Sequence, residues 1–202
     1  MEREDKFVVP YNKKKIIKLA LKLFKSPKKV MIIDYEGKRL NSIYGLEEDI
    51  KHIKIPIKYI FIYLIKKFLQ VPFFRAVRNT ESEFKNRIYR LFGMKIGKEV
   101  FIACGAYIDD NFPELITIGD GSIIGKDVSI LAHEFTIKHA RFGKVTIGKQ
   151  VLIGANSMIR SGVTIGDGAV IAMDSFVNRD IPAKEEWGGI PAHKIKKLRK
   201  LI

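Results

Sequence analysis

The residues of this chain best suited to acid–base chemistry are its four histidines, His52, His133, His139 and His193. An imidazole can take a proton from a hydroxyl group at neutral pH and return it later in a reaction. The 202 residues contain no phosphate-binding loop and no G-x-S-x-G, C-x-x-C or H-E-x-x-H motif. A histidine acting as a general base is therefore the first chemical hypothesis.

A six-residue repeat in the second half of the chain must position these side chains. Its nine units are IGKEVF (96–101), IACGAY (102–107), IGDGSI (118–123), IGKDVS (124–129), IGKQVL (147–152), IGANSM (153–158), IRSGVT (159–164), IGDGAV (165–170) and IAMDSF (171–176). Position one is always isoleucine, position two is Gly in six units and Ala in two, and position five is always Val, Ala or Ser.

This period favours a solenoid over an ordinary parallel sheet rich in Val and Ile. Six residues suit one short strand and one turn, and three such sides close a triangular coil of about eighteen residues. We expect the isoleucines to fill the interior and the small residues at position five to leave room at the corners. Glycine at position two suits either turn geometry or close packing of successive coils.

Two insertions interrupt the repeat, at 109–117 and at 136–146. Insertions into solenoids usually form loops on one face, which is often the binding face. The unit before the second insertion reads ILAHEF and places Glu134 at the inward position five. A buried carboxylate there is costly unless it is paired, so either the register shifts or Glu134 has a partner. An insertion can disturb its neighbours without any role in catalysis, but local rules also tend to fail at functional sites, so neighbouring His133 is a candidate base.

The charge of the chain is concentrated in its first half. The net charge is +15, and residues 1–90 hold 22 Lys and Arg against 10 Asp and Glu, whereas residues 91–202 hold 15 against 12. A composition of 47% hydrophobic and 29% charged residues excludes a disordered chain. The basic half suits an anionic partner, and the lack of a reader motif argues against nucleic acid.

Residues 1–90 are expected to form a basic, mostly α-helical region. Amphipathic patterns predict helices over 12–26 and 55–74, and residues 29–45 suit a small hairpin. The 55–74 helix could lie on an anionic membrane surface or pack on the solenoid or a neighbouring subunit. The polar start of the chain and its single cysteine, Cys104, predict a cytoplasmic protein, with peripheral contact at the inner face of the membrane as an open alternative.

The run from Ile96 onward resembles the hexapeptide-repeat acyltransferases, in particular the maltose, galactoside and nodulation-type O-acetyltransferase branch. The motifs that carry the resemblance are GVTIGD (162–167), VNRDIP (177–182) and GIPA (189–192). The resemblance implies a mainly β fold, with a left-handed parallel β-helix of about four coils over residues 91–182. Residues 183–202 are then expected to form a turn and a C-terminal capping helix.

The same resemblance implies the chemistry. It implies transfer of an acyl group, with acetyl as the first choice, from acetyl-CoA to a hydroxyl of a saccharide or glycan precursor, without a metal. It also implies a homotrimer with active sites between subunits and His133 as the catalytic base. The residues implied for acetyl-CoA are Ala155, Met173, Asn178, Arg179, His193, Lys196 and Lys197, and those suggested for the acceptor are Asp109, Asp110 and His139.

The chain also departs from the family pattern. The acceptor-binding asparagine of the family has no counterpart near Ala103 and Gly105, so the acceptor stays open. A non-catalytic β-helix scaffold is one alternative function. A γ-type carbonic anhydrase is another, although it needs three zinc-binding histidines with an H-x4-H spacing, and five residues separate His133 from His139.

Overall fold

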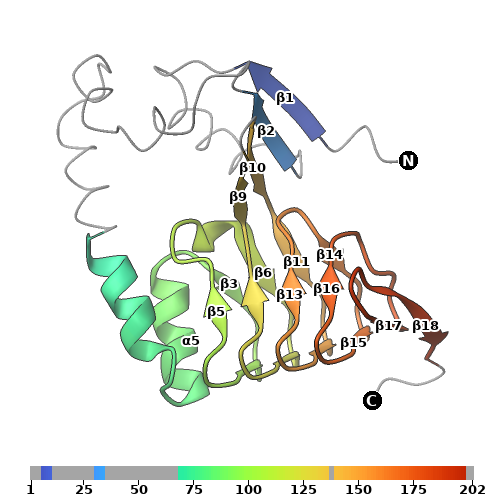
Figure 1. Ribbon diagram of the computed structural model, residues 1–202. Coiled ribbons are helices and arrows are strands. Elements are labelled where there is room, and N and C mark those ends of the chain that lie inside the picture. The colour runs from blue at the N-terminus through green and yellow to red at the C-terminus, as the bar shows by residue number, and fades with distance from the viewer. Residues whose placement is uncertain (1–5, 11–29, 35–67, 137–138, 199–202) are drawn as a thin grey trace.

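The computed structural model describes residues 6–10, 30–34, 68–136 and 139–198. Three sheets of short strands are stacked along most of the second half of the chain, and a separate four-stranded sheet, β1-β2-β10-β9, projects from them (Figure 1). Among the described residues, no helix is long and apolar enough to cross a membrane.

The three sheets surround one interior, and the chain visits them in a fixed order. Sheet 1 contains β3 (Lys95–Ile96), β6 (Ile116–Ile118), β11 (Val145–Ile147) and β14 (Thr164–Ile165). Sheet 2 contains β4 (Phe101–Ile102), β7 (Ile123–Ile124), β12 (Leu152–Ile153), β15 (Val170–Ile171), β17 (Glu185–Gly188) and β18 (His193–Lys197). Sheet 3 contains β5 (Tyr107–Ile108), β8 (Ser129–Ile130), β13 (Met158–Ile159) and β16 (Phe176–Val177). All pairs except β17–β18 are parallel, which is the arrangement of a parallel β-helix.

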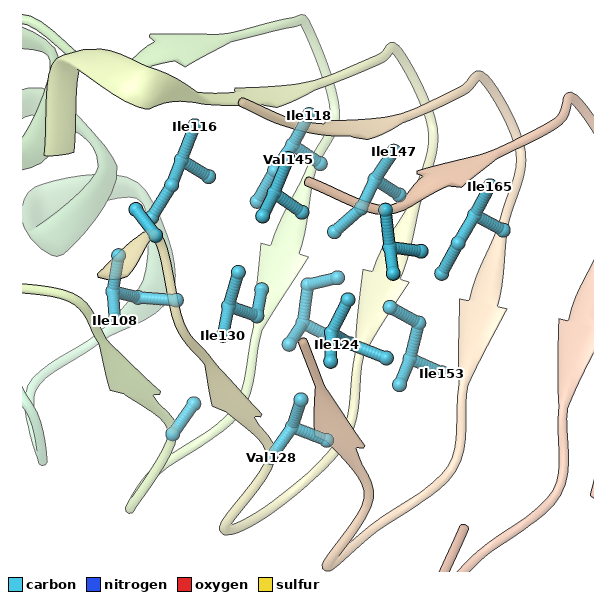
Figure 2. Close-up of a cluster of buried hydrophobic side chains, with 14 of the residues drawn as sticks. Ile108, Ile116, Ile118, Ile124, Val128, Ile130, Val145, Ile147, Ile153 and Ile165 are labelled. Atoms are coloured by element: carbon cyan, nitrogen blue, oxygen red, sulfur yellow. The ribbon is translucent and has the colours of Figure 1, made fainter. Parts of the chain in front are cut away.

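The repeat positions have the environments that the sequence predicts. Isoleucines of position one stack in register, as in the row Ile102, Ile124 and Ile153, and all three are at most 1% exposed. All nine residues of position five are buried as well. Figure 2 shows these apolar side chains converging inside the coils. Each coil therefore adds a layer to one continuous core.

Position two and position four of the repeat have different backbone requirements. A Cβ atom added to Gly154 would lie 2.5 Å from the backbone nitrogen of Met173 in the next coil, so position two is small because coils pack closely. The positive φ angles fall at position four in all nine units: Glu99, Gly105, Gly121, Asp127, Gln150, Asn156, Gly162, Gly168 and Asp174. The turns are thus made at position four, and close coil packing explains the glycines of position two.

The second insertion forms a β-hairpin, which we call the arm. It consists of β9 (His133–Phe135) and β10 (His139–Gly143), which pair antiparallel. Strand β2 (Val30–Asp34) pairs antiparallel with β10, and β1 (Lys6–Pro10) pairs parallel with β2. The predicted loop at 136–146 is therefore largely a strand, because the N-terminal segment supplies hydrogen-bonding partners for it (Figure 1).

Two helices cover the first coil. Residues 68–77 form one helix, and α5 (Ser82–Leu91) forms the other, with the Glu81 carboxylate accepting the backbone N–H groups of Glu83 and Phe84 at its start. The predicted helix over 12–26 and most of that over 55–74 lie outside the described residues. In the predicted 29–45 hairpin, β2 pairs with β1 and β10, and residues 35–45 lie outside the described part. The first insertion contains a short 3-10 helix, η3 (Pro113–Leu115).

The prediction of a C-terminal capping helix is wrong for residues 193–197, which form β18. Strand β17 extends sheet 2 beyond β15 and leaves a free edge, and β18 turns back to pair with that edge. The spacing of Ile195 and Leu198 suits a helix, but the unpaired backbone groups of a sheet edge favour another strand. Residues 199–202 lie outside the described part.

Candidate active site

His133 and Asp109 form a hydrogen-bonded pair, the dyad, at the corner between sheet 3 and sheet 1. Asp109 follows β5 in the first coil, and His133 follows β8 one coil later. The Nδ1 atom of His133 lies 2.5 Å from Oδ2 of Asp109. The same oxygen accepts the backbone N–H groups of Ala132 at 2.8 Å and His133 at 3.1 Å. Coil stacking thus joins two residues that are 24 positions apart in the sequence.

The Asp109 carboxylate is held in its charged form. The side chain is fully buried, and its Oδ1 atom accepts the backbone N–H groups of Asn111 at 3.0 Å and Phe112 at 3.1 Å. Burial by itself would raise the pKa of Asp109, but the hydrogen bond and charge of His133 and the backbone N–H groups outweigh it and lower that pKa. An ionised Asp109 accepts the proton of Nδ1, which leaves the lone pair of His133 on Nε2.

Aromatic rings surround the His133 imidazole. Phe112 and Phe135 contact it edge-on at centroid distances of 5.1 and 5.3 Å, and Phe142 stacks on it at 6.3 Å. The His133 side chain is 17% exposed, and Nε2 has no hydrogen-bond partner among the described residues. The apolar walls limit access of water, while Nε2 stays available to a substrate proton.

Glu134 has the partner that its sequence position requires. The chain keeps its register through Ile130, and Glu134 then lies in β9, outside the core. Arg160 of the next coil donates from Nε to both carboxylate oxygens at 3.0 and 2.9 Å, and its Nη2 lies 2.9 Å from Oε2. The hydroxyl of Ser161 donates to Oε1 at 2.5 Å. Arg160 stands at position two of the one unit that has neither Gly nor Ala there, a signal that sequence reasoning missed.

A second arginine ties the other strand of the arm to the same place. Arg141 of β10 lies opposite Glu134 in the ladder, with Nε 3.7 Å from Oε1 of that carboxylate. It donates from Nε and Nη2 to the carbonyl oxygen of Ser161 at 3.2 and 2.9 Å. We call Glu134, Arg141, Arg160 and Ser161 the arm brace. Because the brace fixes both strands to the next coil, it also fixes the strand that carries His133.

Known proteins share this architecture. The family model "Hexapeptide repeat of succinyl-transferase" matches residues 144–179. A Bacillus subtilis (strain 168) protein named "Putative acetyltransferase YvoF" is 38% identical over 152 residues, which are 75% of this chain and 82% of that protein. The chain belongs to the hexapeptide-repeat acetyltransferases. The predicted family and the predicted enzyme class, an acyltransferase, are therefore confirmed.

Two further acetyltransferases are similar to this chain. The galactoside O-acetyltransferase of Escherichia coli (strain K12) is 31% identical over 120 residues, which are 55% of this chain and 58% of that protein. The crystal structure of the hexapeptide-repeat acetyltransferase VCA0836 of Vibrio cholerae O1 biovar eltor, complexed with acetyl coenzyme A, matches with a TM-score of 0.58 at 23% identity. That match covers 74% of this chain and 94% of the other, and it shows a shared fold.

The residues that the family resemblance implies for acetyl-CoA fall into separate groups. Ala155 and Met173 follow β12 and β15, at the corner between sheet 2 and sheet 3. Asn178 and Arg179 follow β16 and lie at the dyad corner. A single chain of this acetyltransferase therefore does not bring the two groups together.

The remaining basic residues of that prediction lie on the C-terminal hairpin. His193, Lys196 and Lys197 belong to β18 and are exposed. Lys196 pairs with Glu186 at 3.1 Å, which offsets part of its charge. Among the described residues, no three His, Cys, Asp or Glu side chains are gathered to hold a metal ion.

The three residues predicted for the acceptor have different surroundings in the structure. Asp109 is fully buried, and its two oxygens accept backbone N–H groups, including those of Phe112 and Ala132, so the structure places it in the dyad. Asp110 is 9% exposed, and its Oδ1 atom lies 3.2 Å from Asn111 Nδ2 and 3.4 Å from the Tyr107 hydroxyl. His139 begins β10 opposite Asp34, and its side chain lies outside the described part.

Proposed function

We propose that this enzyme transfers the acetyl group of acetyl-CoA to a hydroxyl of a saccharide or glycan precursor, with His133 as general base. The dyad is the observation that carries the proposal. An ionised, buried carboxylate fixes one imidazole nitrogen as a donor and leaves the other as a proton acceptor beside a cluster of aromatic rings. This is the arrangement that activates a hydroxyl nucleophile.

The reaction begins from the His133 tautomer that has its proton on Nδ1 and its lone pair on Nε2. Nε2 of His133 takes the hydroxyl proton while the acceptor oxygen bonds to the thioester carbon. The tetrahedral intermediate collapses as the carbon–sulfur bond breaks, and the imidazolium returns the proton to the departing thiolate. During this cycle Asp109 stabilises the imidazolium by charge and keeps the ring oriented.

Acetyl-CoA is the donor in this proposal. The acetyl-CoA complex of the Vibrio cholerae family member supports this choice. At the corner between sheets 2 and 3, the carbonyl of Ala155 is taken by the N–H of Asp174, whereas the N–H groups of Ala155 and Met173 donate to no acceptor among the described residues. Such N–H groups suit the amide carbonyls of a pantetheine arm.

A homotrimer of left-handed β-helices, with active sites between subunits, belongs to the same proposal. The outer face of sheet 2 carries an apolar row, Phe101, Ile123, Leu152 and Val170, of which Phe101 is 53% exposed. The matching row on sheet 1 is polar: Lys95, Thr117, Thr146 and Thr164. A subunit packed on sheet 2 would cover the apolar row, and the donor corner of one subunit could then meet the dyad corner of another.

The acceptor in this proposal is a saccharide. The galactoside O-acetyltransferase among the relatives supports a saccharide. Asp110 directly follows the dyad carboxylate Asp109, and its contact with the Tyr107 hydroxyl places two groups that bind hydroxyls side by side. Burial and the charges of Asp110 and Asp109 raise the pKa of Tyr107 to about 12, so its hydroxyl stays protonated and able to donate.

The test is acetyl transfer to a panel of saccharides, followed by release of free thiol from acetyl-CoA. His133→Ala should lower kcat by about 10²–10⁴-fold, since that is the usual contribution of a general base. The melting temperature and the affinity for CoA should stay close to those of the parent protein. Unchanged turnover in His133→Ala would remove His133 from the mechanism, and a panel without any acceptor would count against a saccharide.

A further inference from the structure

The helix of residues 68–77 carries apolar residues both on the face that covers the core and on the face that is exposed. Its inner face buries Phe74 and Val77, each at most 4% exposed. Its outer face presents Phe68, Leu69 and Phe73, which are 78%, 45% and 46% exposed. Five of the eleven exposed large hydrophobic residues in the described chain lie between positions 68 and 91. The remaining six lie on the β-helix or its C-terminal hairpin.

The inner face of the helix makes most of its contacts with the fold, and of the outer residues Phe73 contacts Phe92 at a centroid distance of 6.1 Å. Phe74 packs against Tyr89 of α5 at a centroid distance of 4.6 Å, and the side chain of Gln70 donates to the carbonyl of Asp110. Buried Lys85 of α5 donates to the carbonyl oxygens of Arg78 and Ala103 at 3.2 and 3.1 Å. The helix thus packs on the first coil through its inner face. The exposed aromatic residues of its outer face suggest that this face binds a partner.

The basic residues next to the outer face indicate that its partner is anionic. Lys66 and Lys67 immediately precede Phe68 in the sequence, and Arg75 is exposed on the helix itself. The region around them, residues 1–90, carries a net charge of +12. Aromatic and aliphatic side chains flanked by cations are the combination that inserts into the headgroup region of anionic lipid.

We propose that the outer face of helix 68–77 binds the surface of an anionic membrane. Binding is peripheral, through Phe68, Leu69 and Phe73 in the headgroup region and the neighbouring basic residues on the lipid phosphates. In the trimer proposed above, the helical ends of all three subunits lie at the β3–β5 end of the coil stack and would bind together, which strengthens attachment.

The position of this face also bears on the acceptor. Gln70 hydrogen-bonds to Asp110, the residue next to the dyad carboxylate Asp109. The membrane face therefore lies on the same coil as the catalytic corner, at the opposite end of the stack from the C-terminal hairpin (Figure 1). Resting on the proposed function, this placement favours an acceptor saccharide that is attached to a membrane lipid.

The experiment is flotation of the full-length protein with vesicles of phosphatidylcholine alone and with added phosphatidylglycerol, at low and high salt. The protein should float with the anionic vesicles and lose binding at high salt. The double variant Phe68→Ser/Phe73→Ser should bind at least about tenfold more weakly, and Lys66→Glu/Lys67→Glu should lose the salt-dependent part. Ile190→Ser, equally exposed but at the other end of the stack, is the matched control and should bind like the parent.

Two results would overturn the proposal. One is parent protein that ignores anionic vesicles at low salt. The other is a Phe68→Ser/Phe73→Ser variant that changes the subunit stoichiometry, since the face would then be a contact between copies of this chain. Acetyl transfer to soluble saccharides is measured in parallel: flotation without transfer contradicts the proposed function alone, and transfer without flotation contradicts the membrane proposal alone.

Discussion

The regular coils and the base of the arm stabilise the same chain by different means. In the coils, stacked isoleucines and backbone hydrogen bonds connect one layer to the next, and polar side chains contribute mainly at the turns, as where Asp120 accepts the N–H of Lys98. At the arm, charged side chains join successive coils through Asp109–His133 and Glu134–Arg160. The difference teaches that the repeat provides the frame, and that the charged departure from the repeat lies at the corner where we propose that the reaction takes place.

The largest effect on stability should come from the coils. Ile153→Ala removes a fully buried side chain from the middle of the stack, so we expect the free energy of unfolding to fall by about 3–4 kcal/mol. Urea denaturation measures this loss. The kcat of the folded fraction should remain within about twofold of the parent value, because Ile153 does not touch the dyad. A large loss of kcat without loss of stability would contradict the division between frame and reactive corner.

The frame was predictable because its determinants are local and repeated. Isoleucine at position one and a small residue at position five recur nine times, and spacing alone predicts the observed burial of eight of these isoleucines and of all nine small residues. The C-terminal strand was not predictable in this way, because residues 193–197 respond to the free edge of β17, which exists only after the sheet has formed. The same holds for β10, whose partner β2 lies more than a hundred positions earlier.

Substitutions in the arm brace should lower the stability by less than Ile153→Ala does, with the main effect at the pair of Glu134 and Arg160. Glu134→Gln should lower the free energy of unfolding by about 1–3 kcal/mol, because it removes the counter-charge of both Arg160 and Arg141 from a half-buried cluster. Arg160→Gln should lower it by less, because Arg141 and the Ser161 hydroxyl remain beside the Glu134 carboxylate. In the double-mutant cycle the coupling energy should be about 1–2 kcal/mol.

The matched control for the brace is the exposed pair of Lys149 and Asp120 in the regular coils, at 3.2 Å. Lys149→Gln should change stability by less than about 0.5 kcal/mol, since solvent screens exposed pairs. Additive effects of Glu134→Gln and Arg160→Gln would show that the brace is no stronger than this surface pair.

The sequence predicts one residue of the candidate site, His133, but not the role of its partner Asp109. His133 stands out because it precedes the break in the repeat, whereas the role of Asp109 depends on how coils stack over 24 positions. The family resemblance suggested Asp109 for the acceptor, because its acidic pair with Asp110 beside an insertion matches the sugar-acetylating branch, yet the burial of Asp109 is decided by the neighbouring coil. Glu134 and Arg160 are each irregular in their own units, and only the stacking shows that each irregularity compensates the other.

The smallest expected difference between the arm and the coils is in how the free energy of unfolding depends on pH in acid. The pKa of Asp109 is lower in the folded protein than its ordinary value of 3.8, so its contribution to stability is present above that value and is lost as pH falls through the folded pKa. Asp109→Asn should therefore flatten the fall of stability below about pH 4, and Ile153→Ala should leave the shape of that curve unchanged. Thermal unfolding at a series of pH values measures both, and parallel curves for parent and Asp109→Asn would contradict the lowered pKa.

The most direct test of the dyad is the kcat of Asp109→Asn for acetyl transfer, measured on protein that retains a cooperative melting transition. An amide cannot accept the Nδ1 proton as a carboxylate does, and it gives the imidazolium no counter-charge. We therefore predict that kcat falls by about 10²–10³-fold while the affinity for acetyl-CoA is unchanged. A kcat close to that of the parent would contradict the central claim that Asp109 orients His133 as the base.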